Sequence, residues 1–151
     1  MGKWSNWKEI WRIDDIAASF KCPGVYEIRL VDRQANATRI PRFLGVDKEG
    51  LLAIGESKNV SRRIRQFYRA YSGQSSAHSL AERLFVLLFK RINSSSMLKN
   101  SRLEFSCMKL RDKAEAQIHE ERLLKMYFKE FGELPPLNSS LPDKNVDWRK
   151  T

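Results

Sequence analysis

The chain has 151 residues, which is enough for one domain with a packed core and too few for two ordinary domains. Hydrophobic residues make up 42% of it and aromatic residues 11%, which excludes an intrinsically disordered chain. Lysines and arginines number 28 against 18 acidic residues, and the net charge of +10 favours a polyanionic partner, nucleic acid ahead of an anionic membrane. Two cysteines are too few for a disulfide framework, so we interpret Cys22 and Cys107 as reduced thiols.

Membrane insertion and secretion are not indicated by the sequence. The longest apolar run, residues 84–89, falls well short of the roughly 20 residues that a membrane span requires. The residues that follow Lys3 are polar and charged, unlike the apolar stretch of a signal peptide. We therefore expect an intracellular, cytoplasmic protein.

The first expected element is an amphipathic helix over residues 4–20. Its apolar positions recur near helical spacing and are Trp4, Trp7, Trp11, Ile16 and Phe20. We expect this helix to dock on the core. The alternative is a surface for a partner or for nucleic acid, because exposed tryptophans stack well on bases.

Three strands are expected next. A Pro-Gly turn ends the first helix, and residues 25–31 then alternate between apolar and polar, which predicts a strand. Residues 42–46 form a second candidate strand. After a turn at 47–50, the short apolar run 51–55 predicts a strand that is central in the sheet and buried on both faces.

The second half of the chain is mainly helical. We expect a basic helix over residues 57–71, a mostly apolar helix over 79–92, a strand over 103–107 and a long helix over 113–131 that ends at a glycine. The inward side chains expected on the long helix are Ile118, Leu123, Leu124, Tyr127 and Phe128. Helices flanking a small, mainly antiparallel sheet of three or slightly more strands define an α+β class.

Four sequence features follow one another in a fixed order. The tripeptide Gly-Val-Tyr at 24–26 opens a strand, and Ala-Ile-Gly at 53–55 closes a later one. Arg63 lies eight residues after the second tripeptide. Glu120 lies on the long helix with leucines three and four residues later, and Asn138 follows Pro-Pro-Leu.

This ordered set resembles the GIY-YIG nuclease superfamily. The resemblance spans residues 23–138, which we expect to be the nuclease domain, with residues 1–22 an N-terminal helical extension and 139–151 a C-terminal tail. It implies an endonuclease that hydrolyses phosphodiester bonds of double-stranded DNA with Mg²⁺ or Mn²⁺. It also implies that Gly24, Gly55 and Asn138 support the site, Asn138 through hydrogen bonds.

The chemistry of phosphodiester hydrolysis gives each remaining motif residue a role. The reaction requires positive charge at the phosphoryl oxygens and an oriented, activated water. Glu120 is the candidate ligand for the metal ion, with Glu121 as second choice. Arg63 is the candidate for binding the phosphate, and Tyr26 for orienting or deprotonating water. His78, in a polar loop, is a candidate auxiliary base or phosphate contact.

Two departures from the family pattern affect these expectations. Ala53 stands where the second tripeptide normally has tyrosine, so the role of that hydroxyl would have to be taken by Tyr68, Tyr71 or His78. The alternative function is therefore a catalytically impaired module that binds nucleic acid. Residues 32–50 lengthen the hairpin between the two tripeptides. By resemblance this insertion is a DNA recognition element, and otherwise it is a long loop.

The basic helix supports nucleic-acid binding independently of the family. Its cations beside Arg63 are Lys58, Arg62, Arg65 and Arg69. Phosphate contacts by several of them would make binding strongly salt-dependent. A third hypothesis is an interaction protein whose N-terminal tryptophan helix docks a partner.

Overall fold

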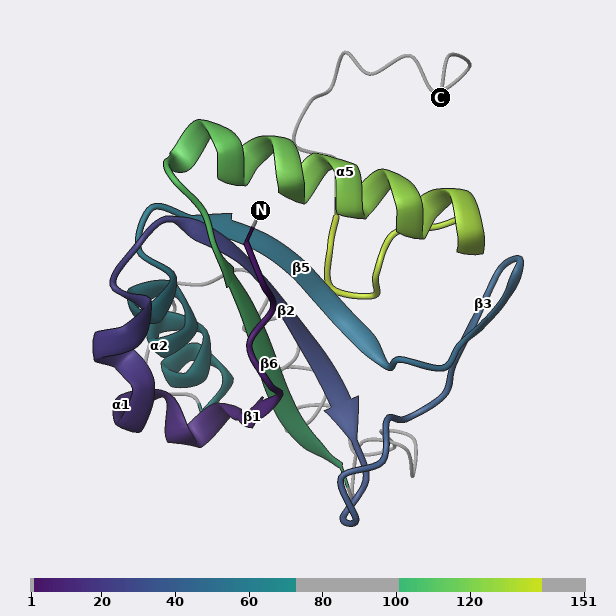
Figure 1. The fold of residues 1–151 in the computed structure, drawn as a ribbon. Helices are drawn as coiled ribbons and strands as arrows, with labels where there is room; N and C mark the ends of the chain where they lie inside the picture. The colour runs from purple at the N-terminus through teal and green to yellow at the C-terminus, as the bar shows by residue number, and fades with distance from the viewer. Residues whose placement is uncertain (1, 73–100, 140–151) are drawn as a thin grey trace.

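A computed structural model describes residues 2–72 and 101–139 of the chain as an antiparallel sheet with helices on both faces (Figure 1). The four strands of the main sheet, in their spatial order, are β1 (Lys8–Glu9), β6 (Arg102–Lys109), β2 (Gly24–Val31) and β5 (Leu51–Ser57). The helices are α1 (Ile13–Ile16), α2 (Val60–Tyr71) and α5 (Lys113–Phe131), and the short 3-10 turns η1 (Ile10–Arg12) and η2 (Ala17–Phe20) flank α1. The expected α+β class is confirmed.

Strand β2 separates two apolar layers because successive side chains of a strand point to opposite faces. Tyr26 and Ile28 belong to the larger cluster, which also contains Ile64 and Phe67 of α2. Val25, one residue away, packs with Ala116 of α5 on the other face. The sheet is therefore covered on both faces.

The expected helix over residues 4–20 is wrong in its first half. Residues 8–9 are strand β1, paired with β6, and Trp4 forms an isolated bridge with Met108. The indole ring of Trp7 packs against the Arg29 guanidinium at 4.2 Å, while Trp11 is 57% exposed. The open edge of β6 offers unpaired backbone groups. Residues 8–9 pair with it as a strand, although the spacing of the tryptophans is typical of a helix. A continuous tryptophan helix for a partner is thus absent from the described chain.

Strand β5 is buried as expected, but it is not central. It lies at one end of the four-stranded order, next to β2. The chain after α5 covers its outer edge: the backbone N–H of Leu137 donates to the carbonyl of Leu52 at 2.9 Å. This return of the chain explains how the apolar run 51–55 can lie in an edge strand.

The insertion between β2 and β5 forms a second, two-stranded sheet. Its strands are β3 (Ile40–Arg42) and β4 (Gly45–Asp47), with a turn where a single strand was expected. The hairpin packs against the end of α5, where the N–H of Leu44 donates to the carbonyl of Phe131 at 3.0 Å. The insertion is thus ordered against the domain, with Phe43 exposed at its tip.

Helix α5 has the boundaries that the sequence predicts, because both ends carry capping residues. The Asp112 carboxylate accepts from the N–H of Glu115 at 2.8 Å, and Gly132 has the left-handed backbone (φ 74°) that favours glycine at a helix end. Leu124 and Tyr127 are buried as expected. Ile118 is 58% exposed, which contradicts its expected inward position, because the short side chain of Ala116 fills the contact with β2 instead.

Helix α2 begins three residues later than expected. Asn59 caps it, and its side chain accepts from the N–H of Arg62 at 3.0 Å. Ser57 remains in β5. The expected helix over 79–92 and most of the expected tail lie outside the described residues.

Candidate active site

Tyr26 lies at the centre of the candidate site, on β2 directly opposite Gly55 of β5. Its side chain is buried, with 2% of its surface exposed. A Cβ atom at position 55 would lie 2.4 Å from both Cζ and Oη of the tyrosine. Only glycine therefore allows the ring to lie across β5 in this position, which gives the second tripeptide its structural role.

Arg63 reaches the same point from α2. The Asn59 cap fixes where this helix starts, so Arg63 falls in its first turn, beside the end of β5. The Arg63 guanidinium lies close to the Tyr26 hydroxyl. Burial raises the pKa of Tyr26 to about 12 in spite of the nearby arginine charge. The tyrosine is thus a neutral phenol at physiological pH.

Glu120 comes to this group from α5, on a third element of the fold. Its carboxylate lies close to the backbone N–H of Glu56 and to the Arg63 guanidinium, and both stabilise its ionised form. Burial, followed by the charge of Glu56, raises the pKa of Glu120 to about 7, and Arg63 opposes this shift. The site therefore holds two carboxylates, Glu56 and Glu120, beside one guanidinium and one phenol.

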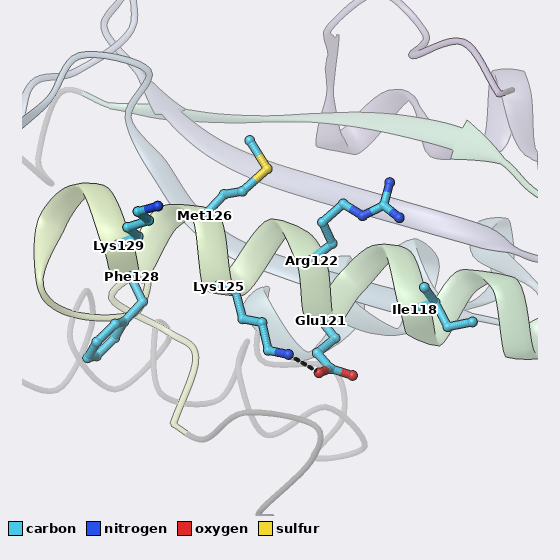
Figure 2. A pocket seen from close by; sticks show the side chains of 7 residues that line it. All are labelled: Ile118, Glu121, Arg122, Lys125, Met126, Phe128 and Lys129. Carbon is cyan, nitrogen blue, oxygen red and sulfur yellow. Dashed lines mark ion pairs between the residues drawn. The ribbon is translucent and has the colours of Figure 1, made fainter. Parts of the chain in front are cut away.

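Glu121, the second choice from the sequence, points elsewhere. It lines a cavity of about 510 Å³ on the outer side of α5, and its carboxylate pairs with Lys125 one turn along (Figure 2). Neighbouring residues of a helix diverge by about 100°, so only one of the two glutamates can face β5. The structure brings Glu120, and not Glu121, to Tyr26 and Arg63.

A basic groove of about 230 Å³ adjoins the site. The side chains that line it come from the end of β5, from α2 and from the start of α5: Glu56, Ser57, Lys58, Arg62, Arg63, Gln66 and Lys113. Lys58 and Arg62 were expected there from the sequence. Glu56, Gln66 and Lys113 were not; the only available signal for Glu56 was that it directly follows Gly55.

The other predicted cations of α2 do not line this groove. Arg65 faces the opposite side and pairs with Asp14 of α1 at 2.9 Å. Arg69 is exposed about one turn beyond Arg65. His78 lies outside the described residues.

Asn138 holds the strand that carries Gly55. Its side-chain oxygen accepts from the N–H of Ile54 at 3.0 Å, and its amide donates to the carbonyl of the same residue at 2.9 Å. This bidentate contact replaces a neighbouring strand at the edge of β5. Gly24 pairs with Ser57 across the sheet, and a Cβ there would lie 2.2 Å from the carbonyl oxygen of Met108. Asn138 thus fixes the backbone of β5, and Gly24 allows β2 to lie close to β6.

Ala53 brings no polar group to the site. It is fully buried, opposite Ile28, in the apolar cluster beneath α2. Tyr68 and Tyr71 pack against this same cluster. Tyr71 lies eight residues after Arg63, about 12 Å along the helix at 1.5 Å per residue. Neither tyrosine is a lining residue of the groove.

The two carboxylates satisfy a simple test for a divalent cation. Oε2 of Glu56 is buried and has no hydrogen-bond partner among the described residues. Such an atom is costly unless positive charge compensates it. Those same residues contain no group of three or more metal-binding side chains. The fit is thus to a hard ion that is held by one or two carboxylates and otherwise by water and phosphate.

The geometry defines a class of protein: an α+β domain with tyrosine, arginine and glutamate gathered at a basic groove. A family model for GIY-YIG domain-containing proteins matches residues 3–131, so the chain belongs to the GIY-YIG domain family. Members of this family are generally endonucleases that act on DNA and typically depend on a divalent metal. No curated protein and no solved structure matches the chain. No helix among the described residues is long and apolar enough to cross a membrane.

Proposed function

We propose that the protein is a divalent-metal-dependent endonuclease that hydrolyses phosphodiester bonds of double-stranded DNA. One observation carries the proposal: Tyr26, Arg63 and Glu120, which lie on three different elements, converge beside a groove lined by three further cations. The +10 net charge and the family support a DNA substrate. Two free cysteines support a reducing, cytoplasmic setting.

Arg63 and Tyr26 act on the phosphate and the water in this proposal. The planar guanidinium binds a phosphate oxygen and offsets charge that develops during the reaction. Because Arg63 lies close to the Tyr26 hydroxyl and a guanidinium can only donate hydrogen bonds, the tyrosine's own proton can be donated to a phosphate oxygen or orient the attacking water. With a pKa of about 12, Tyr26 orients these groups rather than serving as the base.

Glu120 is the proposed ligand of the metal ion. A bound Mg²⁺ or Mn²⁺ would supply positive charge for the phosphoryl oxygens. Lys58, Arg62 and Lys113 line the groove at its rim and contact neighbouring phosphates, which positions the duplex without reading its sequence.

A second candidate function is a catalytically impaired module that binds nucleic acid. Ala53 favours it, because the fully buried methyl group supplies no hydroxyl where the family has tyrosine. Loss of one acid–base group typically lowers a rate by about 10²–10⁴-fold. The two candidates share the basic groove and differ only in turnover.

The test is cleavage of supercoiled plasmid with Mg²⁺ or Mn²⁺, compared with EDTA. The unmodified protein and Glu121→Gln, whose side chain faces away from the site, should nick or linearise the DNA. Glu120→Gln should lose cleavage while it keeps its fold and most of its DNA affinity. Salt-sensitive binding without cleavage by any of the three proteins would favour the impaired module instead. Cleavage by Glu120→Gln at the unmodified rate would remove this residue from the mechanism.

A further inference from the structure

Glu56 stands out among the residues that surround the site, because neither the motif nor the sequence analysis gives it a role. Its Oε2 atom is buried without a hydrogen-bond partner, although its side chain borders a groove rich in donors. Among the described residues, no ion pair joins Glu56 to a lysine or an arginine. Among the described residues, no paired cation therefore compensates this carboxylate.

An acidic neighbour of Glu56, Glu120, makes this need stronger. The charges of Glu56 and Glu120 repel each other, and the Glu120 carboxylate lies close to the backbone N–H of Glu56. The two glutamates are therefore neighbours where α5 packs against β5. Arg63 lies close to both Tyr26 and Glu120, and within the described part of the chain no ion pair joins it to either glutamate. A divalent cation between the two glutamates would offset the repulsion between them.

We propose that Glu56 is a second carboxylate ligand of the metal ion at Glu120, so that this site holds its cation with two carboxylates from adjoining elements. This inference rests on the proposed function and adds a ligand that the family motif does not contain. Mg²⁺ is commonly bound through one or two carboxylates together with waters and substrate phosphate. Water and phosphate oxygens would complete the coordination from the groove side, which Glu56 borders.

Direct binding of Mn²⁺ tests the inference without any DNA or turnover. The free ion is quantified by its electron paramagnetic resonance signal, and four full-length proteins are compared: unmodified, Glu56→Gln, Glu120→Gln and Glu121→Gln. Changes around a metal site typically cost about 10–100-fold in affinity. We expect at least that loss for the first two variants and unchanged affinity for Glu121→Gln. Thermal unfolding gives an independent readout: Mn²⁺ should raise the Tm of the unmodified protein and of Glu121→Gln much more than that of Glu56→Gln.

The possible outcomes separate this inference from the proposed function. If Glu120→Gln loses Mn²⁺ while Glu56→Gln binds it normally, the second ligand is refuted and the metal at Glu120 stands. If the unmodified protein binds no Mn²⁺, both proposals fall. Should Glu56→Gln fail to fold, Glu56→Asp retains the charge but withdraws the carboxylate by one methylene. A loss of affinity in that variant supports direct ligation, and unchanged affinity refutes it.

Discussion

The close approach of Tyr26 to Gly55 makes Gly55→Ala a sharp test of the site geometry. The added Cβ would lie 2.4 Å from Cζ and Oη of the tyrosine, whereas ordinary contacts begin at 3.4 Å. The ring must therefore retreat by about 1 Å. It has little room to do so, because Tyr26 is only 2% exposed and belongs to the main apolar cluster.

Two effects of known size follow from that displacement. Overpacking a core costs about 1–3 kcal/mol, so the free energy of unfolding should fall by this amount in urea denaturation. Moving the hydroxyl by about 1 Å relative to Arg63 should lower the rate of plasmid cleavage by about 100-fold. DNA affinity should change far less, because the groove cations remain in place.

Gly45→Ala is the matched control. A Cβ at this exposed strand position has no atom within 4 Å, so the substitution should change stability by less than about 0.5 kcal/mol. A double-mutant cycle with Tyr26→Leu gives a further check, since Gly55→Ala should cost much less once the ring is absent. If Gly55→Ala were as stable and as active as Gly45→Ala, the packing argument would be refuted.

Three further predictions concern the surroundings of the site. Asn138→Ala removes both hydrogen bonds to the edge of β5. Urea denaturation should show a free energy of unfolding lower by about 1–3 kcal/mol, and plasmid cleavage should be reduced as well. Unchanged stability would show that the strand edge needs no such partner. Burial, together with the charges of Glu49 and Asp47, raises the pKa of Glu27 to about 7. The ionised carboxylate therefore opposes folding, and the free energy of unfolding should decrease as the pH rises from 4.5 to 7. Glu27→Gln should therefore be more stable than the unmodified protein at pH 8 but not at pH 4.5, and an equal difference at both values would contradict this cause. The pKa of Glu120 is about 7, and only the ionised carboxylate binds a cation. Mn²⁺ affinity should therefore increase as the pH rises from 6 and become constant above about pH 7 to 8. An affinity that is constant across this whole range would show that Glu120 does not titrate there.

Local sequence signals determined several elements of this protein. The bounds of α5 follow from an aspartate cap at one end and a glycine at the other, both of which act within a few residues. The alternation in residues 25–31 predicted β2 for a similar reason, since successive side chains of a strand point to opposite faces and the pattern is visible within a few residues. The order of the motif residues also pointed to Tyr26, Arg63 and Glu120, which the fold brings together.

Only the tertiary structure decided which alternative each ambiguous segment adopted. The tryptophans near the N-terminus have helical spacing, yet an unpaired edge of β6 drew residues 8–9 into a strand. The position of β5 at the sheet edge, with Asn138 closing it, depends on contacts between segments 84 residues apart. Likewise, the choice between Glu120 and Glu121 depends on which side of α5 faces the sheet. Glu56 and Glu120 come together from two elements that are far apart in the chain. No local pattern in the sequence could therefore predict that they are neighbours.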